Sequence, residues 1–191
     1  MRVRRAVADD APAIATVYVR SWQAAFVGLV PQSYLDDLDP DSLVDTWHRT
    51  LQSTDWPRRG VFVLLDDPDD APDGAHSGRR GRVSGFVCLS PSRDADADAG
   101  LVGEIQTLYL EPEAFGTGAA VLLMTAALDE LRSGGFRSAS LWALETNDRA
   151  RRFYERHGWR PDGATKRNDW GAFVRTDVRY LLDLGAPGGG A

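Results

Sequence analysis

The segment from residue 108 to residue 120 joins an apolar run to a helical pattern through a loop of small residues. It reads LYLEPEAFGTGAA, so Gly116 and Gly118 come just before the two alanines that open the helical pattern. The first N–H groups of a helix have no partner inside the helix and lie at the positive end of its dipole. Because glycine and alanine have little or no side chain, an anion can approach these N–H groups closely. The segment therefore predicts a strand, a phosphate-binding loop and a helix.

A second strand and helix follow along the chain. Residues 137–144 are predicted to form a strand, and the segment 147–159 reads NDRARRFYERHGW. Asn147 is a favourable N-cap, apolar side chains recur at helical spacing from Ala150 onward, and Gly158 supplies a left-handed stop. The pattern predicts a short helix between Asn147 and Gly158.

Together these two segments resemble the GNAT superfamily of N-acetyltransferases. The first family motif, Q/R-x-x-G-x-G/A, has Gly118 and Ala120 in place but Phe115 where the family usually has glutamine or arginine. The second motif is matched at Asn147, Ala150, Phe153, Tyr154, Gly158 and Trp159. The resemblance covers about residues 1 to 184. It implies an α/β fold with a central mixed β-sheet of about six to seven strands and helices on both faces.

The resemblance also implies acetyl-CoA as the cosubstrate. It assigns the donor contacts to Leu108, Tyr109, Leu110, Phe115, Gly116, Thr117, Gly118, Ala119, Ala120, Asn147, Ala150 and Tyr154. Phe115 would remove one polar contact near the pyrophosphate, which puts the affinity for CoA in doubt more than the fold. Arg149, Arg151 and Arg152 either meet the 3'-phosphate or form a solvated helix face.

Acetyl transfer to an amine requires a neutral nucleophile, a polarised thioester carbonyl and a proton for the departing thiolate. An amine with the pKa of lysine is neutral in only about one molecule in a thousand at pH 7, so a carboxylate base would help. Glu104, in the strand before the glycine loop, is the predicted base and acceptor contact, although it could also be a solvent-facing carboxylate. In the family, the tyrosine at the position of Tyr154 protonates the CoA sulfur, and backbone N–H groups near Leu110 polarise the carbonyl. A core role beside Phe153 is the alternative for Tyr154.

In the GNAT superfamily the acceptor pocket is shaped by the first two helices and the last hairpin, and here these segments are rich in aromatic residues. They are Trp22, Phe26, Tyr34, Trp170 and Phe173. We expect Trp22 and Phe26 to contact the acceptor, because aromatic rings suit a cation or a flat ligand. Core packing is the alternative. The acceptor is expected to be a small-molecule or peptide amine.

Composition narrows the class of protein further. The chain has 191 residues, 43% hydrophobic and 26% charged, which favours a single domain over residues 1–184 with a flexible glycine-rich tail over 185–191. Its net charge of −6 disfavours nucleic acid. The sequence predicts no signal peptide, membrane segment or metal site, since His48, His76 and His157 lack ligand spacing. A homodimer stays open.

A single cysteine and a single lysine carry information about the cell. Cys88 cannot form an internal disulfide, which fits the cytoplasm, and it is expected to be a small buried residue of a strand. Lys166 is the only lysine, whereas arginine is frequent, which suggests a GC-rich bacterial coding sequence.

Apolar periodicity predicts the remaining elements. A first helix follows Pro12 and ends before Gly28, and a later one carries its apolar stripe between Leu43 and Leu51. Strands are expected at 61–65, 82–90, 103–110 and 178–184, with loops at 66–81 and 92–100.

Two other readings compete with an acetyltransferase. A Rossmann-type dinucleotide fold is disfavoured, because Val121 occupies the place of the third glycine. A non-catalytic GNAT-like domain that binds acyl-CoA as a sensor or scaffold remains open, since Phe115 would suit a weakened donor site. The presence of both Glu104 and Tyr154 favours the enzyme.

Overall fold

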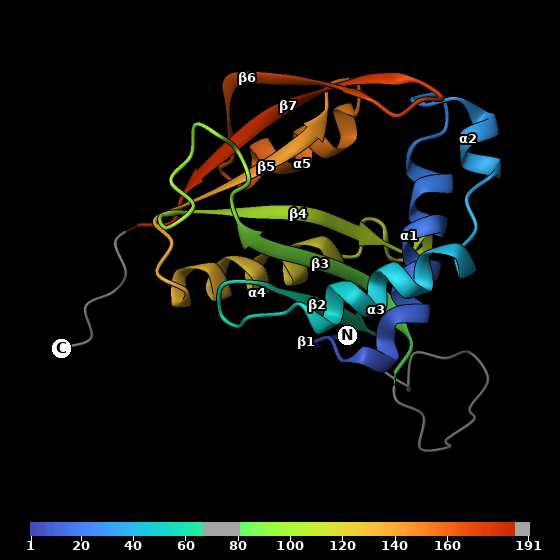
Figure 1. Cartoon of the computed structure of the whole chain (residues 1–191), viewed down its shortest axis with the longest axis horizontal. Coiled ribbons are helices and arrows are strands. Elements are labelled where there is room, and N and C mark those ends of the chain that lie inside the picture. The colour runs from blue at the N-terminus through green and yellow to red at the C-terminus, as the bar shows by residue number, and fades with distance from the viewer. Residues whose placement is uncertain (67–80, 186–191) are drawn as a thin grey trace.

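The computed structural model describes residues 1–66 and 81–185, in which one mixed sheet is covered by helices on both faces (Figure 1). The strands are β1 (Arg2–Arg5), β2 (Gly60–Leu65), β3 (Val83–Pro91), β4 (Val102–Leu110), β5 (Ser138–Leu144), β6 (Arg160–Asp169) and β7 (Val174–Asp183). The α-helices are α1 (Ala11–Ala25), α2 (Gln32–Asp36), α3 (Val44–Gln52), α4 (Ala119–Ser133) and α5 (Asp148–Arg156). Short 3-10 turns are η1 (Ala8–Asp10), η2 (Asp41–Leu43) and η4 (Pro112–Ala114).

This architecture confirms the predicted α/β class and the sheet of six to seven strands. The predicted helices and strands lie within a few residues of their expected bounds. Most of the predicted loop over 66–81, and all but Gly185 of the predicted tail, fall outside the described residues. The single domain over 1–184 stays a prediction.

The sheet has the order β1-β2-β3-β4-β5-β7-β6. All neighbouring strands are antiparallel except β4 and β5, which are parallel and pair only between Val102–Ile105 and Ser138–Leu141. Beyond this short ladder β4 continues to Leu110 paired only with β3, and β5 continues to Leu144 paired only with β7. Figure 1 shows the two strands diverging. The divergence leaves one edge of each strand free for other contacts.

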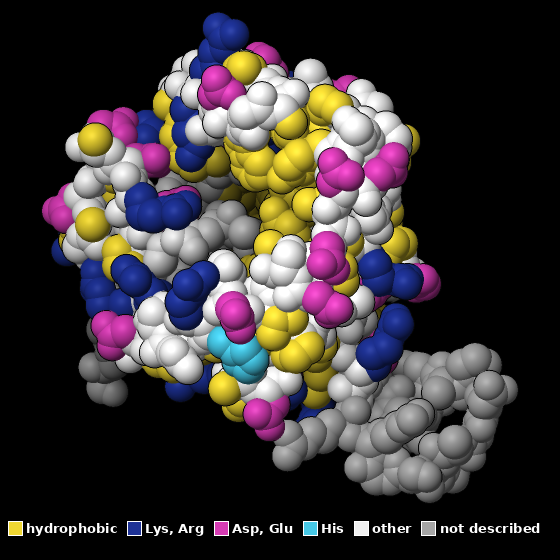
Figure 2. Space-filling view, turned by 45° about the vertical axis from the view of Figure 1, so that its right-hand side comes forward, with side chains coloured by type: hydrophobic (Ala, Val, Ile, Leu, Met, Phe, Trp, Pro, Cys, Tyr) yellow, Lys and Arg dark blue, Asp and Glu magenta, His cyan; other side chains and the backbone are white. Residues whose placement is uncertain are grey.

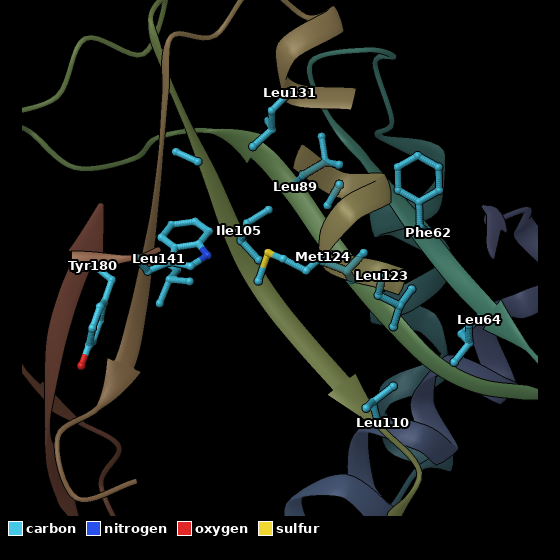
Figure 3. Close-up of a cluster of buried hydrophobic side chains, with 14 of the residues drawn as sticks. Phe62, Leu64, Leu89, Ile105, Leu110, Leu123, Met124, Leu131, Leu141 and Tyr180 are labelled. Carbon is cyan, nitrogen blue, oxygen red and sulfur yellow. The ribbon is translucent and has the colours of Figure 1, made fainter. Parts of the chain in front are cut away.

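One face of the sheet is covered by α4. Its residues Leu123, Ala127 and Leu131 recur every four positions and are fully buried, as the 3.6-residue period of a helix requires. Together with Met124 they pack on β2, β3 and β4. Figure 3 shows Leu123, Met124 and Leu131 directed at the leucines and Ile105 of the strands. The same cluster extends to the inner side of α5.

The opposite face is covered by α1 and α3. Ile14 and Val17 of α1 and Trp47 of α3 pack against Phe86 and Cys88 of β3. Cys88 is 4% exposed, and burial raises the pKa of its thiol to about 12, which agrees with the predicted buried position on a strand.

A third apolar cluster closes the end of the sheet where β4 and β5 diverge. It includes Trp22 of α1, Phe26 just after that helix, Leu35 of α2 and Leu144 of β5, and Tyr109 of β4 packs against it. This cluster ties the first two helices to the separated ends of both strands.

Two adjacent leucines of α4 test the assignment of its buried face. Leu123 is fully buried and Leu122 is 44% exposed. Leu123→Ala should lower the free energy of unfolding by about 2–5 kcal/mol, because it leaves a cavity in the core. Leu122→Ala should change it by no more than about 0.5 kcal/mol. Urea denaturation of both variants measures the difference, and equal losses would contradict the assigned face.

Candidate active site

A cavity of about 470 Å³ lies where β4 and β5 diverge. Its walls include residues 105–110 of β4, residues 141–144 of β5, the glycine loop and one side of α5. Ser21 and Ala25 of α1, Phe26 just after that helix, and Arg175 of β7 complete the lining. A space-filling view of the end where α1 and α2 lie shows a hollow with many hydrophobic side chains around it (Figure 2). One cavity thus reaches from the phosphate loop to the helices predicted to shape the acceptor pocket.

The glycine loop has the backbone geometry of an anion site. Gly116 and Gly118 have φ of 78° and 88°, values that favour glycine, and a Cβ added to either would meet nothing within 4 Å. The N–H groups of Val121 and Leu122 donate to the Gly118 carbonyl. In the described part of the chain, the N–H groups of Ala119 and Ala120 have no backbone acceptor, as expected for the first turn of a helix.

An ion-pair cluster fixes this loop to α1. Arg20 donates to the carboxylate of Glu111, which is buried, and at 2.8 Å to that of Glu113. The N–H of Glu111 also donates to the carbonyl of Ser84 at 2.8 Å. The segment between β4 and α4 is therefore held on two sides before the glycines begin.

Most of the predicted donor-site residues line the cavity. They are Leu108, Tyr109, Leu110, Phe115, Gly116, Gly118, Ala120, Asn147, Ala150 and Tyr154. Thr117 and Ala119 do not: the Thr117 hydroxyl donates to the carbonyl of Ala114 at 2.8 Å, and the Ala119 side chain is fully buried. At Ala119 this leaves the backbone N–H as the group that a ligand could contact.

A positive charge lies next to Phe115 in the structure. The guanidinium of Arg149, on α5, lies over the Phe115 ring at 4.0 Å from its centroid, and both residues line the cavity. Stacking on an aromatic ring is a favourable position for arginine. A cation from a different element therefore stands next to the position where the family usually has glutamine or arginine.

Asn147 and Tyr154 come from the start and the inner face of α5. The Asn147 side-chain oxygen accepts a hydrogen bond from the Ala150 N–H at 3.1 Å, which confirms the predicted N-cap. Tyr154 lines the cavity and packs its ring against Trp159 and Tyr180. Its hydroxyl has no hydrogen bond within the described residues. Burial is the main cause that raises the pKa of Tyr154, so its phenol is protonated at neutral pH.

Glu104 lies on β4 before the glycine loop, as predicted, but away from the cavity where a base would act. Its side chain is buried and does not line the cavity. Arg93 donates to both carboxylate oxygens, through Nη2 at 2.9 Å and Nε at 3.3 Å, and the Arg93 N–H adds a third contact at 3.2 Å. The carboxylate is therefore held in an ion pair with the segment after β3 and is not presented to an acceptor.

Of the aromatic residues predicted to shape the acceptor pocket, one lines the cavity and the others pack behind or beside it. Phe26 lines the cavity, whereas Trp22 is 1% exposed and stacks behind Phe26 with ring centroids 4.3 Å apart. Tyr34, Trp170 and Phe173 contact one another as a cluster beside Trp22 without lining the cavity. Trp22 therefore packs behind Phe26 and does not line the cavity, and its contact with the acceptor stays a prediction.

Several lining residues had no signal in the sequence. Gln106 lies on β4 and donates to the Ser90 hydroxyl at 2.7 Å, His157 follows α5, and Arg175 lies on β7. The family motifs do not include these positions. Arg175 could have been considered from its place near the last hairpin, but only the fold shows that it reaches the cavity.

All five tyrosines have a raised pKa, to about 12 for Tyr109, and burial is the largest cause in each case. The folded state thus binds these protons more tightly than the unfolded state, in which tyrosine titrates near pH 10. The resulting stability is fully present below about pH 10 and is lost as the pH rises through the folded values.

Ultraviolet absorbance should therefore show little phenolate at about pH 10 in the folded protein, and about half-titration in urea. Unfolding free energy should fall above that pH. A folded protein with most tyrosines ionised at about pH 10 would contradict the burial of these side chains.

Comparisons with known proteins agree with this geometry. Residues 32–159 match the model of the acetyltransferase (GNAT) family. The chain is 31% identical over 146 residues to the uncharacterized N-acetyltransferase YuaI of Bacillus subtilis, covering 76% of this chain and 72% of that protein. It is 32% identical over 154 residues to an uncharacterized N-acetyltransferase of Archaeoglobus fulgidus, covering 81% and 89% of the two chains.

Solved structures share the fold. The PaiA N-acetyltransferase of Thermoplasma acidophilum, in complex with coenzyme A, superposes with a TM-score of 0.66 at 17% identity, covering 95% of this chain and 98% of that one. The yncA structure from Salmonella typhimurium, with its cofactor acetyl-CoA, gives 0.65 at 18% identity and covers 100% and 98%.

The chain belongs to the GNAT acetyltransferase family. Within the described ranges, 1–66 and 81–185, no cluster of histidine, cysteine or acidic side chains could hold a metal ion. In those same ranges no helix combines the length and the apolar character needed to cross a bilayer.

Proposed function

We propose that this protein transfers an acetyl group from acetyl-CoA to an amine, with both substrates bound in the cavity between β4 and β5. The main observation behind the proposal is the start of α4 at the glycine loop. In the described chain, its first backbone N–H groups have no backbone acceptor, and the loop lines a cavity of about 470 Å³. Such a helix start binds phosphate oxygens through backbone N–H groups and the helix dipole. PaiA and yncA, whose structures hold coenzyme A and acetyl-CoA, support the choice of ligand.

The donor would lie with its pyrophosphate at Gly116 and Gly118 and its pantetheine arm along the free edge of β4. Arg149, stacked on Phe115, would supply the positive charge beside the pyrophosphate. The thioester would then reach the interior of the cavity, where backbone N–H groups near Leu110, on the edge of β4 that does not pair with β5, would polarise its carbonyl.

The transfer itself is a direct attack. The amine nitrogen forms the new C–N bond to the acetyl carbon, and the C–S bond of the thioester breaks. Tyr154 gives its proton to the departing sulfur, because its phenol is protonated and lines the cavity. The proton released by the amine passes to water and restores the phenol. Arg93 holds Glu104 and no carboxylate lines the cavity in the described part of the chain, so we assign no carboxylate as the base at the amine.

Two glycines at opposite ends of α4 test the phosphate loop. Gly118 and Gly135 both have positive φ, and a Cβ at either meets nothing within 4 Å, but only Gly118 lines the cavity. Valine at each position should therefore cost a similar 1–2 kcal/mol or so in backbone strain. Calorimetry should show acetyl-CoA binding weakened by at least about 10-fold in Gly118→Val and unchanged in Gly135→Val. Equal affinity in the two variants would refute the loop assignment.

Tyr154→Phe tests the proton donor, since it removes a hydroxyl and keeps the packed ring. The turnover number should fall by about 100-fold, with the dissociation constant of acetyl-CoA unchanged, because only the transition state loses an interaction. Tyr18→Phe, a half-buried tyrosine outside the cavity, is the matched control. Thiol release reports the rate.

Turnover of Tyr154→Phe within about twofold of the parent would remove Tyr154 from the mechanism. Acetyl-CoA binding without thiol release over a broad panel of amines would instead favour the non-catalytic acyl-CoA-binding domain.

A further inference from the structure

The charges along the cavity are all of one sign. Among the described residues that line it there is no aspartate or glutamate, and the four charged residues are Arg149, Arg152, Arg156 and Arg175. The first three lie on α5, next to the glycine loop, and can serve the phosphates of the donor. Arg175 lies apart from them on β7, near the aromatic residues of the predicted acceptor pocket. We call this part of the cavity the acceptor end.

Arg175 is placed at the acceptor end by its aromatic neighbours. Its guanidinium lies 4.8 Å from the ring centroid of Trp170 and 5.9 Å from that of Trp22 on α1. It lines the same cavity as Ser21 of α1 and Phe26, which follows that helix. The aromatic cluster that could have received a cationic acceptor thus already holds a cation of the protein itself.

The orientation of Arg175 is fixed from behind by Asp177. Nε and Nη2 of Arg175 lie 3.1 Å and 3.0 Å from Oδ2 of Asp177, whose side chain is fully buried. Asn168 donates to the same oxygen. Nη1 of Arg175 has no hydrogen-bond partner within the described residues, so one end of the guanidinium remains available while the other is anchored. The Arg175 side chain is 17% exposed.

These contacts define what the acceptor end can accept. A polyamine or another polycation would meet the guanidinium of Arg175 first, because Asp177 is buried behind it and, among the described residues, no carboxylate lines the cavity. A carboxylate would instead gain a charge-assisted hydrogen bond from a guanidinium that is already oriented and partly desolvated. Ala25 and Phe26 provide an apolar wall beside it for the rest of the molecule.

We propose that the acceptor is an amine that also carries a carboxylate, an amino acid or a close analogue, and that Arg175 binds this carboxylate. The proposal rests on the proposed function and names its substrate class. In this arrangement Arg175 is a specificity-determining residue: it positions the acceptor so that its amino group points toward the thioester.

A matched ligand series tests the substrate class in the unmodified protein. Each amino acid of a panel is compared with its amide and with its decarboxylated amine, and spermidine represents the polycations. Thiol release with acetyl-CoA should be at least about 10-fold more efficient, in kcat/KM, for the best amino acid than for its amide or decarboxylated amine. Spermidine should be a poor acceptor.

Variants of Arg175 test the residue. Arg175→Gln should raise the KM of the amino acid by about 10- to 100-fold with the KM of acetyl-CoA unchanged, and should reduce the preference for the amino acid over its amide. Arg175→Lys keeps a charge beside Asp177 and should fold like the parent, with an intermediate KM. Arg167→Gln, an exposed arginine of β6, is the control and should change neither KM.

The outcomes separate the two proposals. Decarboxylated amines or spermidine used as well as amino acids would overturn the inference and leave the acetyltransferase standing, as would an unchanged preference in Arg175→Gln. If no amino acid reacts and none binds the CoA complex in calorimetry, the inference also fails. Calorimetry with acetyl-CoA alone reports on the proposed function, which fails if this ligand does not bind.

Discussion

The short pairing between β4 and β5 is the constraint on which the rest of the molecule depends. Four residues of each strand form the only parallel ladder in the described sheet, and past Ile105 and Leu141 the strands diverge. The backbone edges exposed there would be costly to bury without partners. The glycine loop, α5 and α1 surround this gap without filling it, so a cavity exists because the ladder stops.

The local features of the site could be predicted from the sequence because each depends on residues close together in the chain. The helix start after Gly118 follows from glycines and alanines in a row, and the N-cap at Asn147 follows from its own side chain. The apolar runs of β2 and β3 are buried on both faces, which makes them easy to recognise. β6 is mostly exposed and lacks such a pattern, so its bounds were not predicted.

The charges around the site could not be predicted in the same way, because they depend on contacts between distant elements. Glu104 is neutralised by Arg93, eleven residues away across a strand connection. Phe115 suggests a lost polar contact, yet Arg149 of α5 stacks on its ring. Arg175 reaches the cavity only because β7 lies next to β5. Side-chain direction at such positions is set by the assembled sheet, not by local preference.

The four-residue ladder is also the only backbone pairing, within the described sheet, between strands β1–β4 and strands β5–β7. Strands β1 to β4 lie on one side of the ladder and β5 to β7 on the other. Two apolar clusters join these parts: the core between α4 and the sheet, and the cluster around Trp22 and Leu144. A ligand bound in the gap would contact both β4 and β5 and would therefore link the two parts of the sheet. Occupancy therefore couples to the local opening of the protein, and hydrogen exchange along β5 becomes a measure of whether the gap is filled.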